Sequence, residues 1–260
     1  IAIRDRDPEA WYNLGIALLK QRLVASAIEH FDHVLTLKPD YAEAHHNRSA
    51  ALLLSENYEE GLAEYEWRFR SRDFPPARFR WPRWDGSSLE GRTIVLCSEQ
   101  GLGDTIEFVR YAPLVKARGA RVIVECQKAL HVILARTPGI DAWTSAAEPA
   151  PTADCCAPLM SLPFHFKTSY TTIPAEVPYV FADAQLETAW RARLEEEFRA
   201  ARLKVGIAWQ GNPKCPGDAW RSIPLAEYAP LAAIEGVRLF NLQKGARRLS
   251  ELWLRLTVLL

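Results

Sequence analysis

The stretch Asp7–Ala44 reads DPEAWYNLGIALLKQRLVASAIEHFDHVLTLKPDYAEA and contains two helical patterns separated by a short polar turn. Leucines recur at helical spacing, two small residues stand where the helices would meet, an aromatic residue fills the space between them, and a proline ends the second helix. In that order, these residues are Leu14 and Leu18, Gly15 and Ala27, Phe31, and Pro39. The stretch predicts a hairpin of two packed helices.

The hairpin has the spacing of a tetratricopeptide repeat, a unit of about 34 residues with a W-x2-L-G signature. Adding about 34 positions to Ala27 and Phe31 gives Gly61 and Tyr65, which are again small and aromatic. A second, degenerate repeat is therefore predicted over residues 41–69. Since about three repeats are normally needed for a stable stack, we expect these hairpins to pack against the next domain or to have lost repeats that preceded them.

The segment 72–91, RDFPPARFRWPRWDGSSLEG, interrupts the helical periodicity with three prolines, two glycines and two tryptophans. Such a composition indicates an ordered connector, because large aromatic side chains are unfavourable to leave in water. We expect Trp81 and Trp84 to dock on both flanking domains.

From Arg92 onward, apolar runs typical of buried strands alternate with helical patterns. The expected strands are 93–99, 121–127, 203–211 and 237–245, and the expected helices begin near Asp104 and span 129–137, 186–202, 223–236 and 246–260. We expect Pro113 to kink or split the first of these helices. Strand, helix and strand at this spacing predict parallel pairing with right-handed crossovers, as in a doubly wound sheet.

The predicted fold class is multidomain, α followed by α/β. The domains are helical repeat hairpins (1–72), the connector (73–91), a first Rossmann-like lobe (92–184), and a linking helix with the start of a second such lobe (185–260). The second lobe has room for about two strands, where a complete lobe has roughly five or six. The chain begins at Ile1 without a signal peptide, and we expect both ends to be cut.

Charge and cysteine content narrow the class of protein. Lys+Arg and Asp+Glu both number 32, so no net positive field favours nucleic acid. The five cysteines form no CxxC pair, which predicts reduced thiols in a cytoplasmic protein and no zinc or other metal site. His45 and His46 are neighbours on a helix and are expected at the surface. The segment 249–260 is too short and too mixed to span a membrane.

The loop Ser98–Thr105, SEQGLGDT, lies between the first expected strand and its helix. Ligands of open α/β sheets bind at the carboxyl ends of strands, where this loop is placed. Its candidate cleft residues are Gln100, Gly101, Gly103 and Thr105, whose glycines let the backbone approach a ligand. The loop fails as a dinucleotide fingerprint, because Ile106 stands where GxGxxG needs its third glycine.

Asp104, at the start of this helix, has two interpretations. Its carboxylate would repel a phosphate, but it can act as a base toward an acceptor hydroxyl. Alternatively, Asp104 only caps the helix by accepting hydrogen bonds from its first free N–H groups, and the pattern alone favours this cap. For Glu99, a role in the site and a position at the protein surface are equally open interpretations.

Two further loops follow expected strands. Gly211, Asn212, Arg221 and Ser222 combine polar groups, a guanidinium and a helix start, which could bind a diphosphate. The alternative is a turn with Arg221 solvated or paired with Asp218. In the next loop, Lys244 could neutralise a leaving phosphate, although lone loop lysines are usually solvated.

Several segments in order resemble bacterial tetratricopeptide-repeat proteins that carry a heptosyltransferase-like glycosyltransferase module. They are YEEGLAEYEWRFR (58–70), RFRWPRWDGSSLEGRTIVL (78–96), EQGLGDTIEFVRYAPLVKARGARVIVECQ (99–127), KVGIAWQGNP (204–213), RSIPLAEYAPL (221–231) and LFNLQKG (239–245). The resemblance implies two Rossmann-like lobes of the GT-B type that face a cleft. It also implies inverting, metal-independent transfer from a nucleotide sugar, which is a co-substrate, so that no cofactor is expected.

In that family a Gly-Asp pair supplies the catalytic carboxylate, and it matches Gly103-Asp104; with the resemblance counted, a functional Asp104 is favoured. Arg221 and Lys244 would offset charge on the leaving diphosphate, while the repeats bind an acceptor or partner protein. Relatives usually carry histidine where Cys215 stands, and a later Asp-Thr-x-x-x-His segment is absent. We therefore expect this fragment to be inactive alone. The alternative function is a protein-interaction adaptor whose α/β part is a non-catalytic scaffold.

Overall fold

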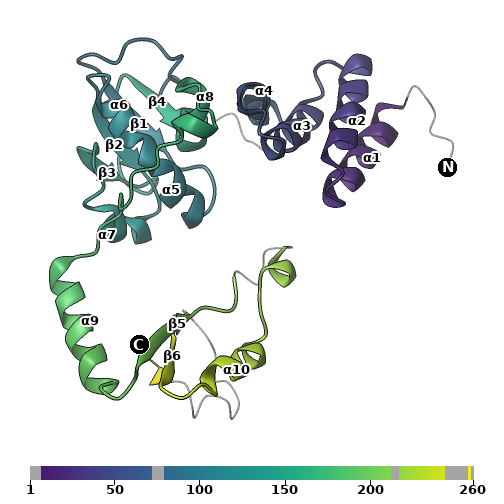
Figure 1. Cartoon of the computed structure of the whole chain (residues 1–260). Helices are drawn as coiled ribbons and strands as arrows, with labels where there is room; N and C mark the ends of the chain where they lie inside the picture. The colour runs from purple at the N-terminus through teal and green to yellow at the C-terminus, as the bar shows by residue number, and fades with distance from the viewer. Residues whose placement is uncertain (1–6, 72–78, 212–216, 244–256, 259–260) are drawn as a thin grey trace. The chain divides into compact units, whose positions relative to one another are not determined.

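The computed structural model describes residues 7–71, 79–211, 217–243 and 257–258 (Figure 1). The chain divides into two compact units, residues 1–181 and residues 182–260. The first unit begins with helical hairpins and continues with parallel strands and intervening helices. The second unit contains parallel strands and helices. This arrangement confirms the predicted multidomain α and α/β class.

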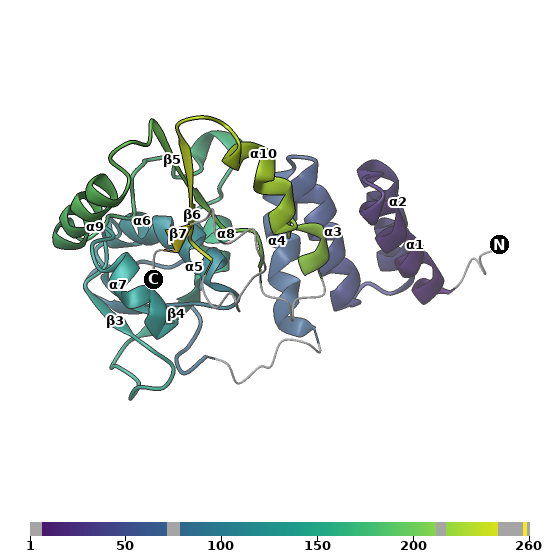
Figure 2. The same ribbon diagram turned by 90° about the horizontal axis from the view of Figure 1, so that it is seen from below.

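Two helical hairpins open the first unit. They comprise α1 (Pro8–Lys20), α2 (Val24–Leu37), α3 (Ala42–Leu54) and α4 (Tyr58–Tyr65), followed by the 3-10 turn η1 (Glu66–Arg70). Each helix packs on the next along the chain (Figure 2). Asp7 caps α1 because its Oδ1 accepts from the N–H of Glu9 at 3.1 Å, and a proline at the first helical position needs no such partner.

The first hairpin is packed as its sequence pattern predicts. Ala27 and Phe31 are fully buried, and Gly15 lies directly against the Phe31 ring. A Cβ atom added at Gly15 would lie 2.7 Å from Phe31 Cε1, closer than two carbons can approach. The missing side chain at Gly15 is therefore what allows α1 and α2 to approach.

Substituting valine for Gly15 is expected to lower the free energy of unfolding by about 1–3 kcal/mol, because the buried Phe31 ring has no room to move. Urea unfolding followed by circular dichroism measures the change. Gly103→Ala is the matched control, since no atom lies within 4 Å of its added Cβ. Equal stability of the Gly15→Val variant and the parent would contradict the close approach of these helices.

The first unit also contains a four-stranded parallel sheet in the order β3-β2-β1-β4. Its strands are β1 (Thr93–Cys97), β2 (Arg121–Glu125), β3 (Ala142–Thr144) and β4 (Cys155–Pro158). The strand order reverses between β1 and β4, since β2 and β3 extend the sheet on the other side of β1. Such a reversal is the point where open parallel sheets bind ligands.

Alternate residues of β1 and β2 pack on opposite faces of this sheet. On one face, Ile94 and Val122 lie in a core with residues of the covering helices, such as Val115 and Leu134. These helical segments are α5 (Leu102–Phe108), η3 (Val109–Tyr111), α6 (Ala112–Lys116), η4 (Lys128–Leu130) and α7 (His131–Leu134). Pro113 lies in the first turn of α6, so the expected split of the first helix is confirmed.

The connector covers the other face of the sheet. Phe79 and Trp81 pack against a buried cluster that contains Val95 and Cys156. Trp84 joins the core of the helical face and donates from Nε1 to the carbonyl of Ser87 at 2.9 Å. Both tryptophans therefore dock on the α/β lobe, one of the two domains that they are expected to contact.

The connector reaches the repeats through other side chains. The ring centroids of Phe79 and Phe69 lie 5.9 Å apart, and the Arg83 guanidinium lies 4.2 Å from the Phe69 ring. Three short helical segments complete the unit: η5 (Leu159–Ser161), α8 (Leu162–His165) and η6 (Tyr170–Thr172). The four cysteines that the structure describes are unpaired, as expected.

The second unit consists of α9 (Ala184–Glu197), β5 (Leu203–Ile207), η7 (Asp218–Trp220), η8 (Leu225–Tyr228), α10 (Ala229–Ala232), β6 (Val237–Asn241) and β7 (Thr257–Val258). Its strands are parallel in the order β5-β6-β7. The expected continuous helix over 223–236 is replaced by η8 and α10, because Pro230 cannot donate inside a helix and lies in the first turn of α10.

The end of the chain differs from the expected helix. Residues 257–258 extend the sheet as a third strand, so the helical prediction is wrong there, and residues 246–256 lie outside the described part. The core of this unit is small, built around Ile207, Trp209, Val237 and Leu239.

Candidate functional site

The loop that follows β1 ends at Asp104, in the first turn of α5. The Gly101 N–H donates to Asp104 Oδ2 at 2.8 Å, so the carboxylate does bond the helix start. The second oxygen, Oδ1, has no hydrogen-bond partner within the described part of the chain, and the side chain is half-buried. The carboxylate can therefore cap the helix and still accept a proton through its other oxygen.

Side chains of the same loop hold its shape. The Gln127 amide donates to the carbonyl of Gln100 at 2.9 Å, and the buried Thr105 hydroxyl donates to Gln127 Oε1 at 3.1 Å. Thr105 therefore supports the loop from beneath, whereas Gln100, Gly101 and Gly103 are exposed along its rim. The strand-end loop is thus held in one conformation by hydrogen bonds from the sheet.

A buried ion pair joins the repeats to this end of the sheet. Arg68 donates from Nε and Nη2 to the two oxygens of Glu99, both at 3.0 Å. The Arg68 side chain is 3% exposed and that of Glu99 is 0% exposed. Burial raises the pKa of the Glu99 carboxyl, and the Arg68 guanidinium opposes that rise. The open possibility of a surface position for Glu99 is therefore wrong.

The same guanidinium binds three further groups, the first of which is the carbonyl of Tyr65, at 3.1 Å from Nη1. Arg68 donates to Ser161 Oγ at 2.7 Å and to Glu66 Oε1 at 2.7 Å, and the Ser161 hydroxyl donates to the same Glu66 oxygen at 2.8 Å. Glu66 and Arg68 belong to η1, whereas Glu99 and Ser161 follow β1 and β4. The end of the repeats is therefore bound at the point where the strand order reverses.

Tyr65, the last residue of α4, lies beside the Asp104 loop. Its hydroxyl accepts from Gln100 Nε2 at 3.2 Å. Its ring contacts the Arg68 guanidinium, 4.3 Å from the ring centroid, and the ring of His46 in α3, at a centroid distance of 5.5 Å. Burial raises the pKa of Tyr65 to about 12, and the charges of Glu99 and Asp104 add to the effect.

The prediction that the two neighbouring histidines of α3 lie at the surface is wrong. His45 is buried, stacks on Trp67 at 3.7 Å and contacts the Glu64 carboxylate at 2.5 Å. His46 is partly buried, and both burial and the nearby Arg68 lower its pKa. The two side chains face different directions, as predicted, but each one packs against an aromatic residue at the end of the repeats.

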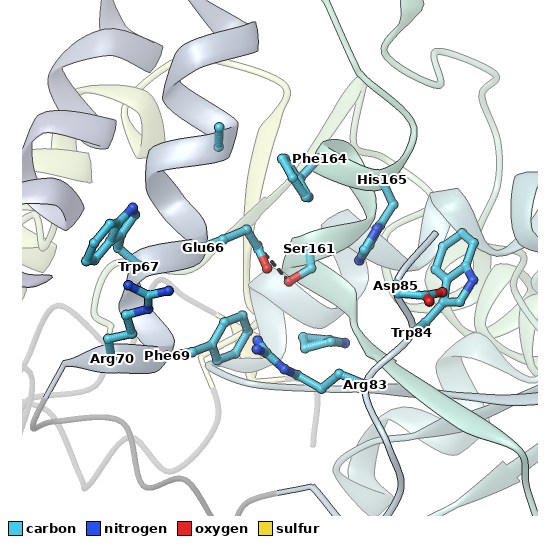
Figure 3. Close-up of a pocket in the computed structure, with 12 residues that line it drawn as sticks. Glu66, Trp67, Phe69, Arg70, Arg83, Trp84, Asp85, Ser161, Phe164 and His165 are labelled. Carbon is cyan, nitrogen blue, oxygen red and sulfur yellow. Dashed lines mark hydrogen bonds between the residues drawn. The ribbon is translucent and has the colours of Figure 1, made fainter. Parts of the chain in front are cut away.

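A pocket of about 430 Å³ opens where η1, the connector and α8 meet (Figure 3). Its lining includes Glu66, Trp67, Phe69, Arg70, Arg83, Ser161 and His165. The two arginines lie over aromatic rings, Arg70 at 4.2 Å from Trp67 and Arg83 at 4.2 Å from Phe69. None of the predicted site residues that the structure describes lines this pocket.

In the second unit, the loop after β5 folds on itself. The Gly211 N–H donates to Ser222 Oγ at 3.3 Å, and Arg221 Nε donates to Asp218 Oδ1 at 3.3 Å. The Arg221 side chain remains 55% exposed. Gln243 Oε1 accepts from the N–H groups of Trp209 and Gln210, which connects the ends of β5 and β6. Asn212 and Lys244 lie outside the described residues.

Sequence reasoning missed the residues that connect the repeats to the sheet: Tyr65 had been assigned only as a repeat aromatic, and Arg68 and Ser161 were not singled out. A buried arginine can be suspected when a repeat tail places it among aromatic residues, as in EWRFR (66–70). Its partner, Glu99, stands 31 residues further on, where no periodicity indicates the pairing.

Known proteins match this chain in its repeats and over most of its length. Residues 8–41 match the tetratricopeptide repeat family. Protein FlbA of Caulobacter vibrioides is 24% identical over 306 aligned positions, covering 92% of this chain and 50% of FlbA. This chain therefore spans about half the length of that curated relative.

Among solved structures, a mutant O-GlcNAc transferase of Thermobaculum terrenum is similar over 54% of this chain and 35% of its own, with 15% identity and a TM-score of 0.25. The repeat match and the fold define a protein with tetratricopeptide-type hairpins joined to parallel α/β units. Within the described residues, every helix is too short or too polar to cross a bilayer.

Proposed function

We propose that this chain belongs to a glycosyltransferase of the GT-B type, in which the first α/β lobe binds the acceptor and the second unit binds a nucleotide sugar. Asp104 is the general base. The repeat hairpins bind a protein, either the acceptor or a partner that brings it. The resemblance of the loops to heptosyltransferase-like enzymes supports the reaction type.

The observation that carries the proposal is the position and bonding of Asp104. The residue lies in the loop after β1, where the strand order reverses and where open parallel sheets bind ligands. Oδ2 bonds the loop, while Oδ1 has no partner among the described residues. A carboxylate with one oxygen fixed and the other available is suited to remove a proton from a bound hydroxyl.

The proposed reaction is a single displacement. The acceptor oxygen attacks the anomeric carbon of the sugar as its proton moves to Asp104 Oδ1, and the bond from that carbon to the diphosphate oxygen breaks. The nucleoside diphosphate leaves and the configuration at the anomeric carbon inverts. Arg221 and Lys244, rather than a metal ion, would offset the charge that grows on the leaving group.

Isothermal titration with the nucleoside diphosphates UDP, GDP and ADP tests the donor side. Both the chain as given and any natural form that continues beyond residue 260 are titrated, because a nucleotide site needs rigid support. We expect binding by the longer form, and weaker binding after Arg221→Met. The absence of binding to every nucleotide by every form would exclude a nucleotide-sugar enzyme.

An adaptor function is the second candidate, favoured by the tetratricopeptide match at residues 8–41. Under that proposal the full chain binds protein partners, and the Asp104→Asn substitution changes neither the partners nor their affinity. Consumption of a nucleotide sugar that depends on Asp104 would exclude it.

A further inference from the structure

We infer that Tyr65 of the last repeat helix is an acceptor-binding residue, which donates a hydrogen bond from its hydroxyl to a polypeptide acceptor positioned at Asp104. The inference rests on the proposed function, since it names the acceptor class and a residue of the same site. It assigns to the repeats a direct contact with the reacting substrate, in addition to any recruitment of proteins.

The hydroxyl of Tyr65 donates its proton only to a weak acceptor among the described residues. Its oxygen accepts from Gln100 Nε2 at 3.2 Å, while its proton points to the thioether sulfur of Met160 at 3.6 Å. A thioether is a weak acceptor. No oxygen or nitrogen acceptor for this proton is found within the described residues, so an oxygen atom of a ligand would be a better partner.

The ring is fixed so that the hydroxyl stays at this position. The Arg68 guanidinium lies against the ring, and Arg68 is itself held by the buried carboxylate of Glu99. His46 contacts the ring from α3. Because burial raises the pKa of Tyr65 to about 12, the phenol keeps its proton at neutral pH and acts as a donor, not as a second base.

A short series of contacts connects this hydroxyl with the proposed base. Gln100 bonds the Tyr65 hydroxyl with its side chain, and the next residue, Gly101, donates its N–H to Asp104 Oδ2. The charge of Asp104 also contributes to the pKa of Tyr65, as expected for groups that share one rim. The Tyr65 hydroxyl and the Asp104 carboxylate are therefore bonded to two consecutive residues of one loop.

The chemistry around Tyr65 favours a polypeptide as the acceptor. A neutral phenol donor suits a backbone carbonyl or a side-chain hydroxyl next to the reacting residue. The hydroxyl belongs to α4, the last helix of the two hairpins, and the first of these hairpins matches a repeat family. On the Asp104 loop, the side chain of Leu102 is 47% exposed and offers an apolar contact. A chain extended along the rim can contact the helix and the loop together.

The test uses the full-length protein with radiolabelled UDP-, GDP- and ADP-linked sugars and a host-cell extract that contains both proteins and lipids. A polypeptide that becomes labelled is purified and used to measure the acceptor KM of the parent and of Tyr65→Phe. Loss of one neutral hydrogen bond predicts a KM about 3- to 10-fold higher. Phenylalanine retains the ring contacts, so the melting temperature should fall by no more than about 4 °C.

Tyr170→Phe is the matched control, because it removes the same hydroxyl from a tyrosine that is 70% exposed and has no place in the proposed site. Its acceptor KM should equal that of the parent. An unchanged KM for Tyr65→Phe would overturn the inference while leaving the transfer reaction intact. Label that enters lipid and no polypeptide would overturn the acceptor class. Failure of the parent to consume any of the nucleotide sugars would overturn the proposed function itself.

Discussion

Replacing Arg68 by methionine is expected to lower the free energy of unfolding of the first unit by about 3–5 kcal/mol, one of the largest effects available in this chain. Methionine fills a similar volume but leaves the Glu99 carboxylate without its counter-charge. This loss is costly because the Glu99 side chain has no surface exposed to water. Ser161 and Glu66 also lose the donor that they share. Urea unfolding monitored by tryptophan fluorescence measures the loss.

Two further variants separate charge burial from lost packing. In Arg68→Met with Glu99→Gln, the remaining side chain is neutral and can still accept from the Met160 N–H, which donates to Glu99 at 3.3 Å, so more than half of the lost stability should return. Lys116→Met breaks an ion pair with Asp141 at the surface and should cost only about 0–1 kcal/mol. Equal losses in the single and double variants would show that packing, not the buried charge, accounts for the effect.

The pH dependence of the Arg68→Met variant follows from the direction of the Glu99 shift. Burial raises the pKa of Glu99, and removing the opposing guanidinium raises it further. A carboxyl with a higher pKa in the folded than in the unfolded chain binds more protons when folded, so stability falls as the pH rises through the folded pKa. The deficit of the variant relative to the parent should therefore be smaller at about pH 5 than at about pH 8. A deficit that grows on acidification would contradict this assignment.

What could be predicted from the sequence was local. The fit of Gly15 against Phe31 follows from helical spacing within one repeat. The Asp104 loop follows from the order of a strand, a short glycine-containing turn and a helix. The parallel pairing was predictable because strands alternate with helices. Each of these inferences uses residues that are close in the sequence.

The features that could not be predicted join distant segments. Arg68 and Glu99 are 31 residues apart, and Arg68 and Ser161 are 93 residues apart, in domains with different periodicities. Nothing in either pattern indicates which surface of the repeats meets which end of the sheet. For the same reason Tyr65 was placed in the packing of the repeats, and its contact with Gln100 became visible only in the structure.

Asparagine in place of Asp104 is expected to lower kcat for sugar transfer by about 100- to 10,000-fold, the range that general-base catalysis contributes. The asparagine oxygen can still accept from the Gly101 N–H, so the bond that holds the helix start is retained, but the amide cannot take up a proton. Release of nucleoside diphosphate by the full-length protein at saturating nucleotide sugar and acceptor measures kcat.

Asp104→Ala and Glu107→Gln distinguish the base from the cap. Alanine removes both roles, so it should lower kcat as far as asparagine does and also destabilise the protein by about 1 kcal/mol through the lost bond to Gly101. Glu107 is an exposed carboxylate on the same helix, and neutralising it should leave kcat unchanged. If Asp104→Asn retains full kcat while Asp104→Ala loses stability, Asp104 only caps α5. The base of the proposed transfer would then have to be another group at this end of the sheet.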